Sequence, residues 1–117
     1  MTQICTTIEQ SKILQELGIS EDTSDMFHPT DFSFPRVYED GDDLKVGLPA
    51  WSLGALIGLL PDEVRNERFN VTYYLTIDKY GIWYSNHMEN EENEYECYGD
   101  LFECCIEMIE ALKLNFV

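Results

Sequence analysis

The stretch Phe69-Asn-Val-Thr-Tyr-Tyr-Leu-Thr-Ile-Asp78 decides the fold, because its polarity alternates with a period of two. The odd-numbered positions hold apolar or aromatic side chains, and the even-numbered positions are mostly polar. Successive side chains of a β-strand point to opposite faces of the sheet, so the stretch predicts a strand with one buried face. The following Lys79-Tyr80-Gly81 predicts a turn, and Ile82–Asn86 returns as an antiparallel strand.

The chain after this hairpin predicts another strand and a closing helix. Glu94–Tyr98 places Tyr95 and Cys97 on one face, as a strand does. Asp100 and Glu103 form a capping box, which predicts the start of a helix. The apolar stripe of that helix is made of Leu101, Cys104, Cys105, Met108, Ile109 and Leu112. This pattern predicts an antiparallel sheet of about three or more strands packed on a C-terminal helix.

The N-terminal part predicts helices instead of strands. Thr6 and Glu9 form a capping box for a helix over residues 7–17, and Gly18 supplies its end. The expected buried face of that helix consists of Ile8, Ile13, Leu14 and Leu17. A second short helix is expected over Ser20–Met26, because Ser20 can cap its first turn.

The segment that follows is the least regular part of the chain. Arg36–Tyr38 and Leu44–Val46 flank an acidic turn and are expected to pair as a short hairpin. Ser52 is expected to cap a helix over Leu53–Leu60, in which Gly54 and Gly58 would permit tight core packing. The resulting fold class is α+β, with N-terminal helices preceding the sheet.

Length and composition predict one globular domain over residues 1–117. The chain is 44% hydrophobic and 13% aromatic, which is enough apolar surface to form a core without disulfides or metals. No stretch approaches the ~20 apolar residues that span a bilayer, and the N-terminus lacks the pattern of a secretory signal. The expected location is the cytoplasm.

The charge of the chain excludes several classes of partner. Acidic residues number 23 against seven basic ones, which gives a formal net charge of −16. Proteins that bind nucleic acid directly need Lys and Arg to neutralise phosphates, so direct binding of DNA or RNA is not expected. An anionic membrane surface is disfavoured by the same repulsion.

No residue pattern predicts catalysis, a cofactor or a metal site. Cys5, Cys97, Cys104 and Cys105 lack the short-spaced pairs of a zinc site and are expected to be reduced core residues. His28 and His87 lie in loop-like contexts without a neighbouring nucleophile motif. We therefore predict no catalytic residue, no cofactor and no metal ligand, which favours a protein that is not an enzyme.

Two acidic segments with neighbouring aromatic residues predict an interaction surface. The segments contain Glu39, Asp40, Asp42, Asp43, Glu89, Glu91, Glu92, Glu94 and Glu96, and the expected anchors include Tyr95 and Tyr98. Such a surface would attract a protein with a basic surface. Three alternatives stay open: acidity that serves solubility alone, a small-ligand or enzymatic pocket near the helix after Trp51, and a structural subunit of a homo-oligomer.

Several segments resemble a known group of proteins. They include Cys5-Thr-Thr-Ile-Glu-Gln-Ser-Lys12, Leu17-Gly-Ile19, Pro49-Ala-Trp-Ser-Leu-Gly-Ala-Leu56 and Leu59-Leu-Pro61. Over most of the chain, the sequence resembles small proteins, without a known activity, that are encoded by prophages and mobile elements of gut anaerobes related to Bacteroides. The resemblance implies only a genomic context, that of a phage or mobile element. By analogy, small acidic proteins of phages include nucleic-acid mimics that inhibit host nucleases, and this favours the interaction surface over the alternatives.

Overall fold

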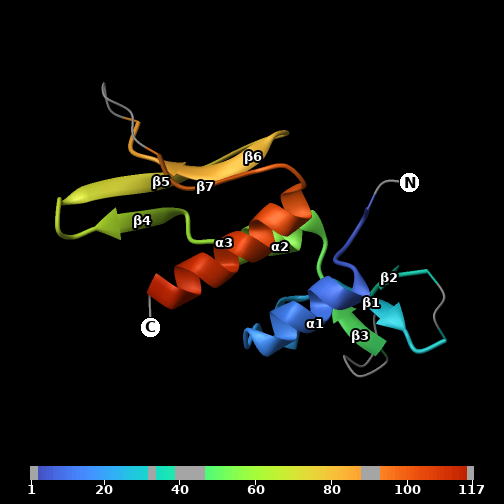
Figure 1. Ribbon diagram of the computed structural model, residues 1–117. Helices are drawn as coiled ribbons and strands as arrows, with labels where there is room; N and C mark the ends of the chain where they lie inside the picture. The colour runs from blue at the N-terminus through green and yellow to red at the C-terminus, as the bar shows by residue number, and fades with distance from the viewer. Residues whose placement is uncertain (1–2, 32–33, 39–46, 88–92, 116–117) are drawn as a thin grey trace. The chain divides into compact units, whose positions relative to one another are not determined.

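The computed structural model describes residues 3–31, 34–38, 47–87 and 93–115 (Figure 1). The fold class is α+β, as the sequence predicts. The chain divides into two compact units, Met1–Leu59 and Leu60–Val117, which we call unit 1 and unit 2. The expectation that residues 1–117 form one domain stays a prediction. Within the described part of the chain, no helix has the length and apolar character needed to cross a membrane.

Unit 2 contains a four-stranded antiparallel sheet in the order β4–β5–β6–β7. Its strands are β4 (Glu63–Asn66), β5 (Val71–Asp78), β6 (Gly81–Ser85) and β7 (Asn93–Tyr98). The predicted hairpin and the strand after it are confirmed. The strand β4 was not predicted; it pairs with β5 from Glu63 opposite Tyr74 to Asn66 opposite Val71. Phe69 precedes β5 and is 65% exposed, so the alternation of the sequence extends beyond the strand.

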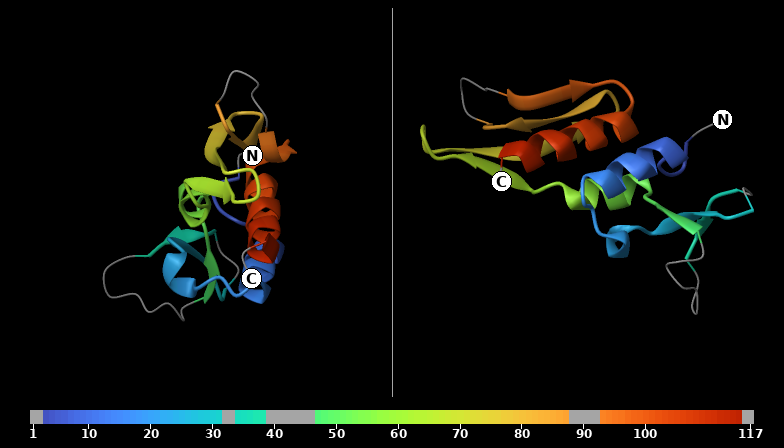
Figure 2. Two further views of the ribbon diagram at one scale, coloured as in Figure 1. Left: turned by 90° about the vertical axis from the view of Figure 1, so that its left-hand side faces the viewer. Right: turned by 60° about the horizontal axis from the view of Figure 1, so that its bottom comes forward.

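The helix α3 (Leu101–Asn115) lies along one face of this sheet and contacts β6 and β7 (Figures 1 and 2). The Asp100 carboxylate accepts a hydrogen bond from the Glu103 N–H at 3.0 Å and caps the helix, as predicted. The buried apolar residues of unit 2 include Phe102, Cys104, Cys105, Ile106, Met108, Ile109 and Leu112 from α3 with Ile82 and Tyr84 from β6. Burial of these apolar side chains is the main force that holds α3 on the sheet.

An irregularity in β7 shapes the edge of the sheet. The register between β6 and β7 shifts between Ile82 and Tyr84, and Tyr95 has a positive φ of 54°. One extra residue on an edge strand produces a β-bulge of this kind. Gly81 lies opposite the far end of β7, where a Cβ atom would overlap the Cys97 carbonyl oxygen, so only glycine fits this turn.

Unit 1 begins with α1 (Ile8–Glu16), whose cap differs from the prediction by one residue. Thr7, not Thr6, is the N-cap: its hydroxyl accepts from the Gln10 N–H at 3.1 Å, and the Gln10 side chain accepts from the Thr7 N–H at 3.0 Å. Gly18 ends the helix with a φ of 84°, as expected. The predicted buried face is wrong in two of its residues, because the helix buries Gln10, Ser11 and Leu14 while Ile8 and Ile13 are exposed.

A small antiparallel sheet in the order β2–β1–β3 follows in unit 1. Its strands are β1 (Met26–Pro29), β2 (Arg36–Val37) and β3 (Gly47–Ala50). The helix expected over Ser20–Met26 is wrong beyond its first turn: η1 (Glu21–Thr23) is a short 3-10 helix, and Met26 already belongs to β1. β2 pairs with β1, with Val37 opposite Met26. The expected hairpin partner Leu44–Val46 lies outside the described residues, so that pairing stays a prediction.

The predicted helix after Trp51 is confirmed as α2 (Leu53–Leu59). The Ser52 hydroxyl accepts from the Ala55 N–H at 3.2 Å, and the Asp25 carboxylate accepts from the N–H and the hydroxyl of Ser52 at 2.8 and 2.5 Å. Gly54 and Gly58 do not serve tight packing, because both are exposed and a Cβ atom would meet little or nothing at either position.

Hydrogen bonds of Thr6 join three segments of unit 1. Its N–H donates to the Trp51 carbonyl at 2.8 Å, and its hydroxyl accepts from the Trp51 N–H at 3.0 Å. The same hydroxyl bonds the Ser11 hydroxyl at 2.8 Å, and the His28 ring Nε2 lies 2.8 Å from the Thr6 carbonyl. Thr6 and Ser11 are fully buried, so these bonds replace the water that both hydroxyls lose on folding.

Candidate interaction surface

The predicted interaction residues fall into three sets. Glu96 and Tyr98 lie near one end of β7, beside the turn between β5 and β6. Glu94 and Tyr95 line a hollow farther along the same strand. The remaining predicted residues, Glu39, Asp40, Asp42, Asp43, Glu89, Glu91 and Glu92, lie outside the described residues, so the structure does not test them.

The first set belongs to a group that we call the aromatic–acidic cluster: Asp78, Tyr80, Trp83, Glu96 and Tyr98. The rings of Trp83 and Tyr98 are 6.0 Å apart between centroids and tilted by 31°. Both neighbours of Trp83 along β6, Ile82 and Tyr84, are fully buried in the core beneath α3. Because side chains alternate along a strand, Trp83 and its neighbour Tyr98 lie on the sheet face away from α3.

Hydrogen bonds fix the backbone of the turn that carries Tyr80. One Asp78 carboxylate oxygen accepts from the N–H groups of Tyr80 and Gly81, at 2.7 and 3.0 Å. The Gly99 N–H donates to the Tyr80 carbonyl at 2.8 Å, which fixes the turn beside the end of β7. Tyr80 and Tyr98 are nevertheless 63% and 61% exposed, so a partner can reach both rings.

The electrostatic setting of Tyr98 shows that carboxylates lie close to its ring. Partial burial, followed by the negative charges of Glu96 and Asp78, raises the pKa of the Tyr98 phenol. The negative charges that act on Tyr98 can also attract a cation to this part of the surface. A cation already occupies such a position nearby, because the Lys79 ammonium lies 5.1 Å from the centroid of the Tyr80 ring.

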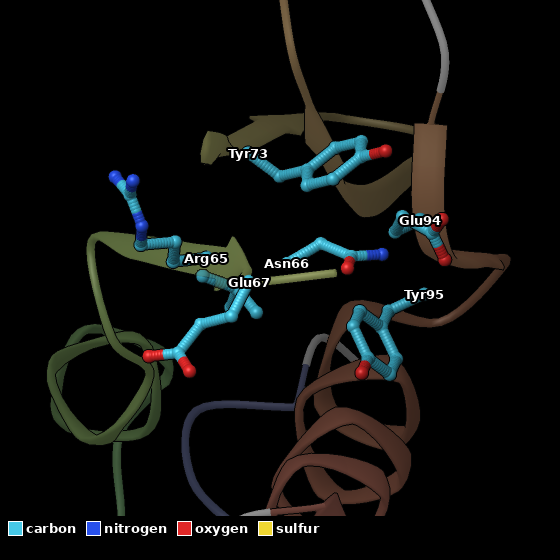
Figure 3. Close-up of a pocket in the computed structure, with 7 residues that line it drawn as sticks. Arg65, Asn66, Glu67, Tyr73, Glu94 and Tyr95 are labelled. Atoms are coloured by element: carbon cyan, nitrogen blue, oxygen red, sulfur yellow. The ribbon is translucent and has the colours of Figure 1, made fainter. Parts of the chain in front are cut away.

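A hollow of about 230 Å³ lies among β4, β5 and β7 (Figure 3). In Figure 3 the side chains of Asn66, Tyr73, Glu94 and Tyr95 surround it, whereas Arg65 points away. Its volume lies below the roughly 300–1,000 Å³ that is usual for small-molecule pockets. Among the described residues that line it there is neither a histidine nor a cysteine.

The cysteines of the chain are free thiols. Cys5, Cys104 and Cys105 are buried, and burial with the nearby charges of Cys104 and Asp100 raises the pKa of Cys105 to about 12. The Cys97 thiol donates to the Glu107 carboxylate at 3.0 Å. Burial, followed by hydrogen bonds to Cys104 and Glu107, raises the pKa of Cys97. Thiols held protonated in this way are weak nucleophiles.

The described residues contain no group of three or more His, Cys, Asp or Glu side chains that could hold a metal ion. Trp51, near which a ligand pocket was a possible alternative, is fully buried. Its indole N–H donates to the Thr23 hydroxyl at 2.9 Å. The Trp51 ring is therefore a core residue, and none of the hollows described here is lined by it.

Comparisons of the chain with protein-family models, with curated proteins and with solved structures found no match.

Proposed function

We propose that this protein is a non-enzymatic accessory protein of a phage or mobile element that binds a basic protein surface through the aromatic–acidic cluster. The observation that carries the proposal is Tyr98, an exposed ring that packs against Trp83 and has the carboxylates of Glu96 and Asp78 beside it. Aromatic side chains are common anchors of protein interfaces, and flanking charges select the partner.

The chemistry of the cluster suits arginine better than other side chains. A guanidinium group can stack on an aromatic face and donate two parallel hydrogen bonds to a carboxylate. The cluster offers both features within one patch of the sheet. The net charge of −16 would speed the approach of a basic partner over a longer range. The same surface suits an inhibitor that occupies the basic groove of a nucleic-acid-binding protein.

The proposal can be tested with a defined basic probe. We expect an octa-arginine peptide to change the fluorescence of Trp83 on binding, and to bind more tightly than octa-lysine. Replacing Tyr98 by Ala should weaken octa-arginine binding about fivefold, the size of a partly desolvated cation–π contact. Glu96→Gln should also weaken binding.

The matched control is Glu9→Gln on α1, because it changes the net charge by the same amount in unit 1. Equal weakening by Glu9→Gln and Glu96→Gln would mean that the probe senses only the total charge. That result would overturn the proposal, as would an unchanged affinity of the Tyr98→Ala variant.

A further inference from the structure

Unit 1 exposes apolar side chains where the sequence pattern predicts a buried face. Ile8 of α1 is 40% exposed, and Ile4 in the preceding segment is 57% exposed. Phe34, which precedes β2, is 81% exposed. Scattered apolar residues need no explanation on a protein surface, but these three line hollows that adjoin one another.

The two hollows share one lining residue, His28. One has a volume of about 390 Å³ and is lined by Ile4, Cys5, Phe34 and Pro35 among others. The other has a volume of about 300 Å³ and is lined by residues that include Ile8, Lys12 and Leu48. Each volume lies within the range of small-molecule sites. Because His28 lines both hollows, they are neighbours within unit 1.

The polar groups of these hollows are few. The Thr6 carbonyl can only accept, so the His28 Nε2 donates its proton there, and this bond fixes the ring that lines both hollows. Among the described residues that line the hollows, Lys12 is the one formally charged side chain. None of these lining residues is a carboxylate, although the chain carries 23 acidic residues.

We propose that unit 1 binds a small amphipathic carboxylate, with its apolar body along the two hollows and its carboxylate at the Lys12 ammonium. The apolar lining favours a hydrocarbon chain or ring system, and the lone cation selects an anionic end. A second copy of the chain is a poorer occupant, because two molecules of net charge −16 repel each other. This site lies in unit 1 and does not depend on the aromatic–acidic cluster.

Calorimetric titration of the full chain with decanoate, and with decanol as its uncharged counterpart, tests this site. We expect decanoate to bind with a stoichiometry of one. Replacing Lys12 by Gln should weaken decanoate about fivefold, as expected for a charge pair at a partly exposed site, and should leave decanol binding unchanged. Replacing Phe34 by Ser should weaken both ligands, because it removes apolar contact area from the larger hollow.

Matched controls come from unit 2. Lys79→Gln and Phe69→Ser remove the same groups from exposed positions there, and neither should change decanoate binding. The proposal fails if decanoate does not bind at millimolar concentration, or if Lys12→Gln and Lys79→Gln have equal effects. It also fails if light scattering shows a dimer that Phe34→Ser dissociates, since a second copy would then cover the hollows.

Discussion

Among single residues, Cys97 shows how a carboxylate placed on a neighbouring helix controls a thiol. Its strand is β7, and the acceptor of its hydrogen bond, Glu107, lies on α3. Removing a proton from Cys97 would place a second negative charge beside Glu107 and break that bond. Burial is the largest cause of the raised pKa of Cys97, and the hydrogen bonds with Cys104 and Glu107 add to it, so the thiol reacts slowly although it is only partly buried.

Replacing Glu107 by Gln should make Cys97 more reactive. Gln removes the negative charge, so the pKa of Cys97 falls and a larger share of thiolate is present at a given pH. We expect the rate of alkylation by iodoacetamide at pH 8 to rise about threefold, equivalent to a fall of about half a pKa unit. Mass spectrometry of the modified peptides gives the rate for each cysteine. Glu110→Gln, one turn later on the same helix, is the control, and equal rates in both variants would contradict this account.

At the scale of elements, α1 shows how tertiary contacts decide which of two neighbouring threonines becomes the N-cap of a helix. Thr6 and Thr7 each have a suitable partner three residues later, Glu9 or Gln10, so the sequence alone allows both frames. Tertiary contacts decide between them, because the hydroxyl of Thr6 is already engaged by Trp51 and Ser11. The helix therefore begins at Ile8, and this start leaves Ile8 itself on the exposed side.

The position of this cap leads to a measurable difference in stability. Thr7→Ala should lower the free energy of unfolding by about 1 kcal/mol, because it leaves the Gln10 N–H without its capping acceptor. Glu9→Gln should lower it by only about 0.3 kcal/mol, through a weaker interaction with the helix dipole. Urea unfolding of both variants gives the two values. A larger cost for Glu9→Gln than for Thr7→Ala would show that Glu9 takes part in the cap.

The length of each element explains which of them the sequence predicts. The alternation of β5 runs through Val71–Asp78, and α3 repeats its apolar stripe over several turns, so both are recognised from the sequence. The strands β1 and β4 have four residues each, too few for a period to stand out. β1 is formed by pairing with β3, which lies far along the chain, and no local pattern records that pairing. β4 pairs with β5 across the short turn at residues 67–70, but its four residues are too few to show a period of two.

The sequence indicates only those residues of the candidate surface that lie close together along the chain. Glu96 and Tyr98 are adjacent to an acidic stretch in the sequence, and this signal identified them. Asp78 was missed as their neighbour, because it comes from β5 and approaches Tyr98 only through the order and register of three strands. In β6, Trp83 lies between Ile82 and Tyr84, which are both core residues. Because side chains alternate along a strand, this position could have indicated that Trp83 lies on the sheet face away from α3.

At the scale of the whole molecule, each unit contains one tryptophan. Trp51 belongs to unit 1 and Trp83 to unit 2, so the variants Trp83→Phe and Trp51→Phe each leave a fluorescent reporter in one unit. If residues 1–117 form one domain, as we predict, unfolding is cooperative and both reporters respond together.

We therefore expect the two single-tryptophan variants to show, in urea, a fluorescence transition that coincides with the far-ultraviolet circular dichroism transition of the same variant. Comparing two probes within one variant removes the change in stability that the substitution itself causes. Fluorescence and circular dichroism midpoints that differ within a variant would mean that the units unfold separately. The chain would then consist of two domains.

The bulge in β7 also bears on how this aromatic-rich chain avoids aggregation. β7 is the last strand of its sheet, and the free edge of such a strand is a template on which another chain can add. At Tyr95 the backbone is in the left-handed region, and the extra residue of the bulge shifts the register of the N–H and C=O groups before Tyr95 relative to those after it. A straight strand from another molecule can match only one side of the bulge, so the bulge disfavours the addition of a further strand at this edge.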